Sequence, residues 1–279
     1  MPSNILFTDL DGTLLRDNTK DVSTQMHLTL EALLAHGHKL VFTSGRPLNS
    51  ILEVIDRLAL RDASGHLTKE GLYISAFNGA LLYDLAAGTA LMEHRIPMKD
   101  VAYLTSQASL SEIYCHTYSD THIITRWNAP ELQAYRKHIH LPVLFSDPIT
   151  DALEKEPFKL IAIDLHQKQA LVRFRQSLLP WSEGRITPLF SNDRYLELFS
   201  CHAGKGNSLI TLCQLLNIPI AHTMAAGDAD NDLSMIEAAG VGVAMSNASD
   251  LVKAHADLIT VHDNNQDGLL PVIKEFFAL

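Results

Sequence analysis

The sequence has few cysteines and no pair of them at a metal-binding spacing. Its three cysteines, Cys115, Cys201 and Cys213, lie far apart in a chain of 279 residues and form no C-x-x-C pair. A disulfide framework or a cysteine-based zinc site is therefore not expected. The 14 histidines form no H-E-x-x-H pattern, so a zinc-protease helix is not expected either.

Long hydrophobic runs and an excess of positive charge are also lacking. No apolar run approaches the roughly 20 residues that a membrane-spanning helix needs. The opening stretch MPSNILFTD lacks the basic segment of a secretory signal. The formal net charge is -10, which opposes binding to nucleic acid or to an anionic membrane surface. We expect a cytoplasmic protein, a monomer or small homo-oligomer, that binds no nucleic acid and no membrane.

The first third of the sequence alternates between strand and helix patterns. Short apolar strands are predicted over 5–9, 39–45 and 72–80. Helices are predicted between them, over 23–37 and 47–58, where apolar residues recur at helical spacing. This βαβαβ order is typical of a parallel sheet that helices cover on both faces.

The middle of the chain has a different pattern. Hairpins are predicted over 80–97 and 112–127, and two further strands over 186–200. A strand over 158–166 and a helix over 170–179 lie between them. Antiparallel hairpins mixed with helices indicate an α+β unit distinct from the first part.

From Lys205 the strand and helix alternation returns and continues to the end of the chain. The fold class predicted is therefore α/β, a doubly wound, mainly parallel Rossmann-like sheet with an inserted α+β domain. We place a discontinuous core domain at 1–82 and 198–279, and the inserted domain at 83–197.

Two aspartates follow the first predicted strand. Asp9 and Asp11 are two residues apart, so on a strand both would face the same side, at the edge of the sheet where α/β proteins bind ligands. Paired carboxylates repel one another, and a hard divalent cation such as Mg²⁺ relieves that repulsion. Taken alone, the pair is better explained by a solvated loop or a helix cap.

Three further stretches also follow strands or begin helices. TSGR (43–46) ends the second strand with hydroxyls and an arginine that suit a phosphoryl oxygen. HAGKGNSL (202–209) puts Lys205 at a helix start, where a cation opposes the helix dipole unless it faces an anion. GDADND (227–232) gathers three aspartates after an apolar strand, without the Gly and Glu spacing of a calcium loop. Because the carboxyl ends of parallel strands meet at one edge, a functional site explains all four stretches better than four unrelated turns.

In this order, DLDGT, TSGR, GKGNSL and GDADND resemble the four motifs of the haloacid dehalogenase-like phosphohydrolases. The large insert and the phrases FNGA and KGNSL resemble the Cof-type branch of that family, whose α+β (C2-type) cap lies between the second and third motifs. The resemblance implies a hydrolase that uses Mg²⁺ to release phosphate from a small phosphorylated metabolite, with sugar phosphates as the expected class. It also implies that the insert closes over the edge of the sheet where the four motifs meet, which we call the rim, and selects the leaving group.

The resemblance also implies roles for individual residues. Asp9 matches the nucleophile that accepts the phosphoryl group. Asp11 matches the acid and base that protonates the leaving alcohol and later activates water, and for the acid step we expect its pKa to be raised. Lys205 matches the lysine that neutralises the phosphoryl oxygens. Asp228 would bind Mg²⁺ with Asp9 and Asp11, the latter through its backbone carbonyl, while Asp232 would support the metal.

Further positions match the phosphate side of the family's site. Ser44 stands where this branch more often has threonine, and Thr43 is the alternative hydroxyl. Gly45 and Arg46 match phosphate-side positions, and Asn231 would touch the phosphate or metal-bound water. Asn78 matches a cap-hinge position, and Asn247 matches a recurrent asparagine that is equally well explained as a helix N-cap.

In the insert, four polar or aromatic side chains alternate along the hairpin CHTYSDTHIITRW. They would share a face that reads a sugar or cofactor phosphate, although an ordinary solvated sheet face explains them as well. These residues are His116, Tyr118, His122 and Arg126.

Three other functions remain open at this stage. A phosphomutase of the same superfamily would pass the phosphoryl group to a second hydroxyl. A receiver-type signalling module also combines aspartates, a hydroxyl and a lysine around Mg²⁺, but it is much shorter and has no place for the insert. A binding protein without catalysis is disfavoured, because Asp9, Asp11, Lys205 and Asp228 are all present.

Overall fold

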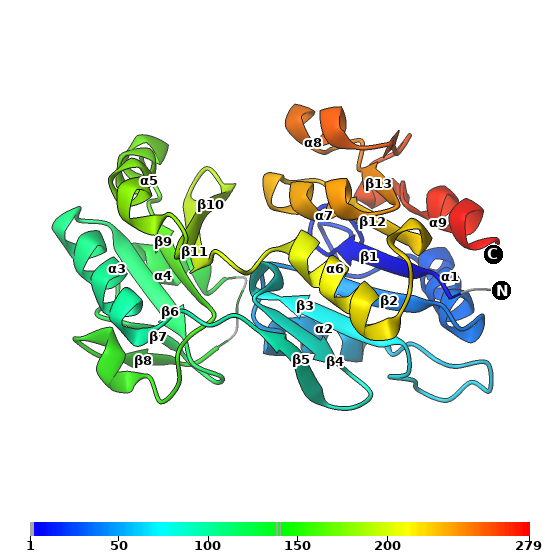
Figure 1. The fold of residues 1–279 in the computed structure, drawn as a ribbon, viewed down its shortest axis with the longest axis horizontal. Coiled ribbons are helices and arrows are strands. Elements are labelled where there is room, and N and C mark those ends of the chain that lie inside the picture. The colour runs from blue at the N-terminus through cyan, green and yellow to red at the C-terminus, as the bar shows by residue number, and fades with distance from the viewer. Residues whose placement is uncertain (1–2, 138, 140) are drawn as a thin grey trace. The chain divides into compact units, whose positions relative to one another are not determined.

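The computed structural model describes residues 3–137, 139 and 141–279 (Figure 1). Contacts divide the chain into two compact units. The core unit runs to Met92 and resumes with Gly204–Leu279, and the inserted unit is Glu93–Ala203.

The core unit contains an eight-stranded sheet in the order β14-β13-β12-β1-β2-β3-β4-β5. The strands from β14 to β3 pair in parallel, and β4 pairs antiparallel with β3. The chain leaves β1 in one direction through β2 and β3, and returns to its other side at β12, so the order reverses between β1 and β12. The strands are β1 (Ile5–Asp9), β2 (Lys39–Thr43), β3 (Leu72–Ala76), β4 (Leu81–Asp84), β5 (Thr89–Glu93), β12 (Thr223–Gly227), β13 (Val241–Ala244) and β14 (Leu258–Ile259).

Helices cover both faces of this sheet, as Figure 1 shows. Every residue of β1, β3 and β12 is buried, although successive side chains point to opposite faces, so neither face of the central strands meets solvent. On one face, Ile5 and Phe7 pack against Leu209 and Leu212 of α6 and Met235 of α7. The helices are α1 (Thr24–Ala35), α2 (Leu48–Leu58), α6 (Lys205–Leu216), α7 (Leu233–Ala238), α8 (Asp250–His255) and α9 (Leu270–Phe277), with 3₁₀ helices η1 (Phe77–Gly79), η3 (Ile220–His222), η4 (Asp230–Asp232) and η5 (Asn264–Gln266).

The inserted unit is a six-stranded sheet in the order β10-β11-β9-β6-β7-β8. Its pairings are antiparallel except for β7 with β8. One face packs on α3 and α5 through a core that includes Leu104, Ile124, Leu160, Phe174 and Leu198. The elements are α3 (Met98–Leu110), β6 (Tyr114–Tyr118), β7 (Ile123–Thr125), α4 (Pro130–Tyr135), β8 (Val143–Phe145), η2 (Ile149–Ala152), β9 (Lys159–Ile163), α5 (Lys168–Ser182), β10 (Ile186–Asn192) and β11 (Tyr195–Ser200).

The predicted fold class, a doubly wound and mainly parallel α/β sheet with an inserted α+β unit, matches this architecture. The predicted domain limits, at 82/83 and 197/198, both lie earlier in the chain than the divisions between the two units. At the first limit the reason is the hairpin β4–β5, whose strands extend the core sheet rather than beginning the inserted one. Alternation within a hairpin shows that two strands pair, but not which sheet they join.

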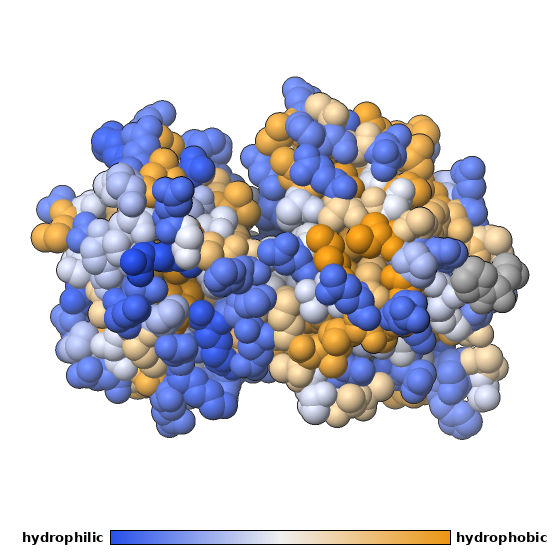
Figure 2. Space-filling model, in the orientation of Figure 1, coloured by the Kyte–Doolittle hydropathy of each residue, from blue (hydrophilic) through white to orange (hydrophobic). Residues whose placement is uncertain are grey.

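The surface carries scattered apolar side chains, visible as orange areas on the face drawn in Figure 2. In the core unit, Leu215 and Ile220 are 55% and 40% exposed. Single exposed apolar residues are common on globular proteins. Among the described residues, the helices are too short or too polar to span a membrane.

Candidate active site

Three of the four motif segments follow neighbouring strands at the same edge of the core sheet. Asp9 ends β1 and lies opposite Thr43, the last residue of β2. On the other side of β1, β12 ends at Gly227, directly before Asp228. The fourth segment begins α6 at Lys205. The site therefore forms where the strand order reverses, which is the usual ligand position of an open α/β sheet.

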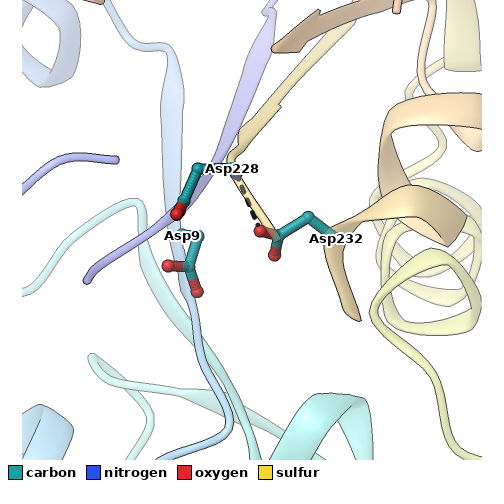
Figure 3. A group of neighbouring side chains, drawn as sticks. All are labelled: Asp9, Asp228 and Asp232. Atoms are coloured by element: carbon teal, nitrogen blue, oxygen red, sulfur yellow. Dashed lines mark hydrogen bonds between the residues drawn. The ribbon is translucent and has the colours of Figure 1, made fainter. Parts of the chain in front are cut away.

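Three carboxylates gather at this edge. Oxygens of Asp9, Asp228 and Asp232 lie within 4.8 Å of one another, and Figure 3 shows the three side chains together. Asp232 is fully buried and is oriented by its own loop, because its Oδ2 accepts hydrogen bonds from the backbone N–H groups of Asp228 (2.9 Å) and Ala229 (3.0 Å). Gly12 is required here, since a Cβ at Gly12 would lie 2.4 Å from Asp228 Oδ2 and its φ of +80° suits glycine.

Lys205 lies inside this cluster. Its ammonium donates to Asp9 Oδ1 at 2.7 Å and to Asp232 Oδ1, and the whole residue is 1% exposed. Burial alone would lower the pKa of Lys205, but the carboxylates of Asp232 and Asp9 raise it on balance, so the lysine stays charged. The predicted contact between this helix start and an anion is present, with carboxylates as the anions.

The cluster has an excess of negative charge that one lysine does not offset. Burial raises the pKa of Asp9 well above its ordinary value, although Lys205 opposes this, and the charges of Asp232 and Asp228 add to the rise. Burial and Asp232 raise the pKa of Asp228 to about 7. Buried carboxylate oxygens at this spacing are the donors that a hard divalent cation prefers, so these residues fit such an ion.

The raised pKa of Asp228 predicts how stability depends on pH without metal. The folded carboxyl holds a proton up to about pH 7, against 3.8 ordinarily, so its contribution to stability is complete below about pH 4 and is lost as pH rises through 7. Between pH 5 and 8 we expect metal-free protein to lose on the order of 2–4 kcal/mol of unfolding free energy from this cluster. Urea unfolding of the protein in excess chelator, at pH 5 and at pH 8, measures this loss of unfolding free energy.

A divalent cation should reverse this loss, because it binds the ionised carboxylates. We expect excess Mg²⁺ to raise the melting temperature more at pH 8 than at pH 5. An equal rise at both pH values would mean that the cluster does not bind the cation through these groups.

Asp11 lies at the same edge but its side chain has other partners. Arg46 binds it with two hydrogen bonds, Nε to Oδ2 and Nη2 to Oδ1, both 2.7 Å, and Lys20 Nζ lies 3.1 Å from Oδ1. Burial would raise the pKa of Asp11, but the hydrogen bonds and charges of Arg46 and Lys20 lower it on balance. The raised pKa that we predicted for Asp11 is therefore wrong for the protein without substrate, because the hydrogen bonds and charges of Arg46 and Lys20 outweigh the effect of burial.

The residues predicted on the phosphate side lie beside this pair. Ser44 is buried, and its hydroxyl accepts a hydrogen bond from the backbone N–H of Arg46 at 3.2 Å. Gly45 lies between them in the chain. The backbone N–H of Asn78 donates to Ser44 O at 3.0 Å, and Asn231 Nδ2 donates to Asn78 Oδ1 at 3.1 Å. These contacts link the TSGR, FNGA and GDADND segments around the rim.

Three more polar groups complete the edge. Thr43, the alternative hydroxyl, is fully buried, and its Oγ1 has no hydrogen-bond partner among the described residues. Thr13 Oγ1 donates to Asp228 Oδ1 at 2.8 Å. Asn247 Nδ2 donates to Gly12 O at 2.8 Å, so it contacts the first motif; the cap of α8 is Ser249 instead.

In the inserted unit, two of the four predicted polar residues contact each other and the other two have different partners. His116 and Tyr118 are buried neighbours, with His116 Nε2 3.1 Å from Tyr118 Oη. Arg126 pairs with Asp147 at 2.8 Å, and His122 bonds Thr121. Their role in reading a substrate stays a prediction.

Lys20 is the charged residue of the rim that the sequence did not reveal. It lies nine positions after Asp11 in a polar loop, where a lysine carries no local signal. Its approach depends on the path of the loop back to the rim.

The whole chain is similar to known proteins. A family model described as haloacid dehalogenase-like hydrolase matches residues 6–273. The chain belongs to this family. The YxeH protein of Bacillus subtilis is 29% identical over 273 residues, which cover 97% of each chain. A solved haloacid dehalogenase-like hydrolase from Bacteroides thetaiotaomicron has a TM-score of 0.85 and 27% identity, covering 98% of this chain and 99% of its own.

Another relative has a named activity. YitU of Bacillus subtilis, 26% identical with 99% of this chain and 98% of its own covered, is named a 5-amino-6-(5-phospho-D-ribitylamino)uracil phosphatase. The predictions of this family, of its fold and of an enzyme of the phosphatase type are confirmed.

Proposed function

We propose that the protein is a Mg²⁺-dependent phosphatase of small phosphorylated metabolites, with sugar phosphates as the expected class, and that it works through an aspartyl phosphate on Asp9. The observation that carries the proposal is the cluster of Asp9, Asp228 and Asp232, in which buried Lys205 bonds Asp9 and Asp232, at the sheet edge where the strand order reverses. The name of the relative YitU also supports a small phosphorylated substrate.

Asp9 is the proposed nucleophile. One of its oxygens attacks phosphorus, the bond from phosphorus to the leaving alcohol breaks, and the phosphoryl group stays on Asp9. Lys205, 2.7 Å from Asp9 Oδ1, offsets the repulsion between the carboxylate and the incoming phosphate. Since one oxygen of Asp9 is fixed by Lys205, the carboxylate has a defined direction of attack.

Asp11 is the proposed acid and base. It gives a proton to the oxygen of the leaving alcohol, and in the second step it takes a proton from the water that attacks phosphorus and frees Asp9. Arg46 and Lys20 keep Asp11 ionised in the free protein, the form that the second step needs. A phosphate dianion near Arg46 and Lys20 would compete for their charge and so raise the proton affinity of Asp11 for the first step.

Mg²⁺ is the proposed cofactor, held by Asp9, Asp228 and the backbone carbonyl of Asp11, with Asp232 in support. When bound, it supplies positive charge that draws the substrate phosphate toward Asp9 and stabilises the transition state. For the phosphate itself, the proposed donors are Ser44, Gly45, Arg46 and Asn231.

The test is a screen of phosphorylated metabolites that measures kcat/KM with Mg²⁺ present. We expect turnover to stop in excess chelator and to return when Mg²⁺ is added beyond the chelator. Full activity in the chelator would contradict the metal assignment.

The same screen separates the remaining alternatives. Release of inorganic phosphate without a bisphosphate activator supports a phosphatase over a phosphomutase. A long-lived aspartyl phosphate with negligible turnover would favour a signalling role. Cytoplasmic localisation, the absence of nucleic-acid and membrane partners, and a monomer or small homo-oligomer stay predictions.

A further inference from the structure

The loop that follows Asp11 is held by a segment from the far end of the chain. Residues 12–20 leave the rim and return to it at Lys20, whose ammonium lies 3.1 Å from Asp11 Oδ1. Residues 15–17 of this loop contact residues 264–267, which comprise η5 and the residue after it. We call this set of contacts the clasp.

Two asparagines form most of the clasp. Asn264 is 3% exposed, and its Nδ2 donates to Leu15 O at 2.8 Å and to Asp17 Oδ1 at 3.1 Å. Asn265 and Asp17 exchange two hydrogen bonds: Asn265 Nδ2 donates to Asp17 Oδ2 at 2.9 Å, and the backbone N–H of Asp17 donates to Asn265 Oδ1 at 3.0 Å. A buried amide with two acceptors fixes its partners firmly, because losing either bond leaves a polar group unpaired.

A salt bridge adds to the clasp, and the turn that presents it is itself well defined. Arg16 Nη2 lies 3.0 Å from Asp267 Oδ2. Asp263 Oδ1 accepts from the backbone N–H groups of Asn265 and Gln266 at 2.9 and 3.0 Å. A Cβ on Gly268 would lie 1.8 Å from His262 O, so only glycine lets the turn close this tightly.

The clasped residues are bonded to both ends of the loop. The backbone N–H of Leu15 donates to the carbonyl of Leu10, the residue before Asp11, at 2.9 Å. Arg16 O accepts from the backbone N–H of Lys20, also at 2.9 Å. A displacement of the clasp therefore moves Asp11 and Lys20 relative to each other.

We propose that Asn264, Asn265 and Asp267 are positioning residues of the active site, which set the approach of Lys20 to Asp11 and so the rate of proton transfer. This proposal rests on the proposed phosphatase function. Catalytic groups tolerate little displacement, and a shift of about 1 Å can cost roughly 100-fold in rate. The clasp residues belong to none of the four motif segments, so the proposed effect on rate requires no contact with the substrate.

A charge swap tests the clasp. Asn265→Asp places a second carboxylate against Asp17, and Asp17→Asn in the same chain restores a donor opposite a carboxylate. We expect Asn265→Asp to lower kcat about 10-fold with KM within about twofold of the wild type, and the double variant to recover most of the loss. A kcat unchanged in Asn265→Asp, or unrecovered in the double variant, would overturn the proposal.

If the clasp only stabilised the fold, its loss would lower activity by reducing the share of enzyme that is folded. Two controls separate this effect from a change in the active site. Ile273→Val removes one buried methyl group from α9, near the clasp in sequence, and should lower stability but leave kcat unchanged at temperatures where circular dichroism shows a folded protein. Lys20→Ala should be additive with Ile273→Val, but not with Asn264→Ala, if Asn264 acts through Lys20. Additive losses for Asn264→Ala and Lys20→Ala would exclude that route.

Hydrogen exchange tests the clasp without any assay of activity. In Asn264→Ala we expect the amides of Leu15, Arg16 and Lys20 to exchange at least about 10-fold faster, and in Ile273→Val we expect them to stay as in the wild type. Unchanged exchange in Asn264→Ala would show that the clasp does not hold the loop. Failure of the phosphatase function itself would appear instead as an inactive wild type with the exchange result intact.

Discussion

Asp9→Asn is expected to abolish phosphate release while the fold stays intact. An amide oxygen is a far weaker nucleophile than a carboxylate, so no aspartyl phosphate forms, and we expect kcat to fall by at least about 10⁴-fold. The fold should persist because Lys205 keeps its hydrogen bond to Asp232, and because burial raises the pKa of Asp9 well above its ordinary value, so that a neutral side chain suits this position. Removal of one of the crowded carboxylates relieves repulsion within the cluster.

The measurement is kcat with the best substrate of the screen, together with urea unfolding of both proteins. Asp56→Asn is a matched control, since Asp56 is an exposed aspartate on α2 and the same chemical change there should leave kcat unaltered. Turnover at the wild-type rate in purified Asp9→Asn would show that Asp9 is not the nucleophile. If Asp9→Asn unfolds, its loss of activity says nothing about the nucleophile. Asp9→Ser would then serve as a second variant.

Lys205→Met should lose both activity and stability. The lysine is the one cation among the described contacts of the buried Asp232 side chain, so its loss leaves buried carboxylates without a counter-charge. Breaking a buried pair in this way costs roughly 3–5 kcal/mol of unfolding free energy. Without charge neutralisation of the phosphate, kcat should fall by at least about 100-fold.

The destabilisation caused by Lys205→Met should depend on pH. With the pKa of Asp9 already raised, removal of Lys205 raises it further, so the carboxyl of Asp9 is protonated over a wider range of pH. The destabilisation of metal-free Lys205→Met should therefore be larger at pH 8 than at pH 5, because protonation at pH 5 removes the unpaired charge. Equal destabilisation at both pH values would contradict the ion-pair account.

A second substitution separates the two effects of Lys205. Adding Asp232→Asn to Lys205→Met removes one buried charge, so part of the lost stability should return. Activity should not return, because the cation opposite the substrate phosphate is still missing. Recovery of activity in this double variant would mean that Lys205 has a structural role alone.

The sequence predicted which motif residues gather at the sheet edge better than it predicted their surroundings, and the roles of these residues stay predictions. Asp9, Lys205 and Asp228 follow apolar strands or begin a helix, and parallel strands bring such positions to one edge whatever the loops between them do. The short strands around them are buried on both faces, so their apolar runs were easy to recognise.

Features that depend on the path of a loop were not predictable in this way. Lys20 reaches Asp11 at the end of a loop that contacts residues 264–267, about 250 positions away in the chain. The lowered pKa of Asp11 follows from Lys20 and from the two hydrogen bonds of Arg46, and neither is visible in the DLDGT motif. Local patterns carry no information about contacts of such long range.

The helices of the inserted unit show a second limit. No element was predicted for α3 (Met98–Leu110), whose helically spaced apolar residues Val101, Leu104 and Ala108 lie among polar and small ones, yet it buries these three in the core of that unit. Packing against a sheet supplies the stability that the sequence pattern of this helix does not reveal.

The most direct test of the account is to trap the phosphorylated enzyme. Acid quenching of the wild type during turnover, followed by borohydride reduction and peptide mass spectrometry, identifies the phosphorylated aspartate, because reduction converts an aspartyl phosphate to homoserine. We predict homoserine at position 9 in the wild type with Mg²⁺, and none in Asp9→Asn or in excess chelator. Turnover with no modified residue at position 9, or with the modification at another aspartate, would contradict the central claim that Asp9 carries the phosphoryl group.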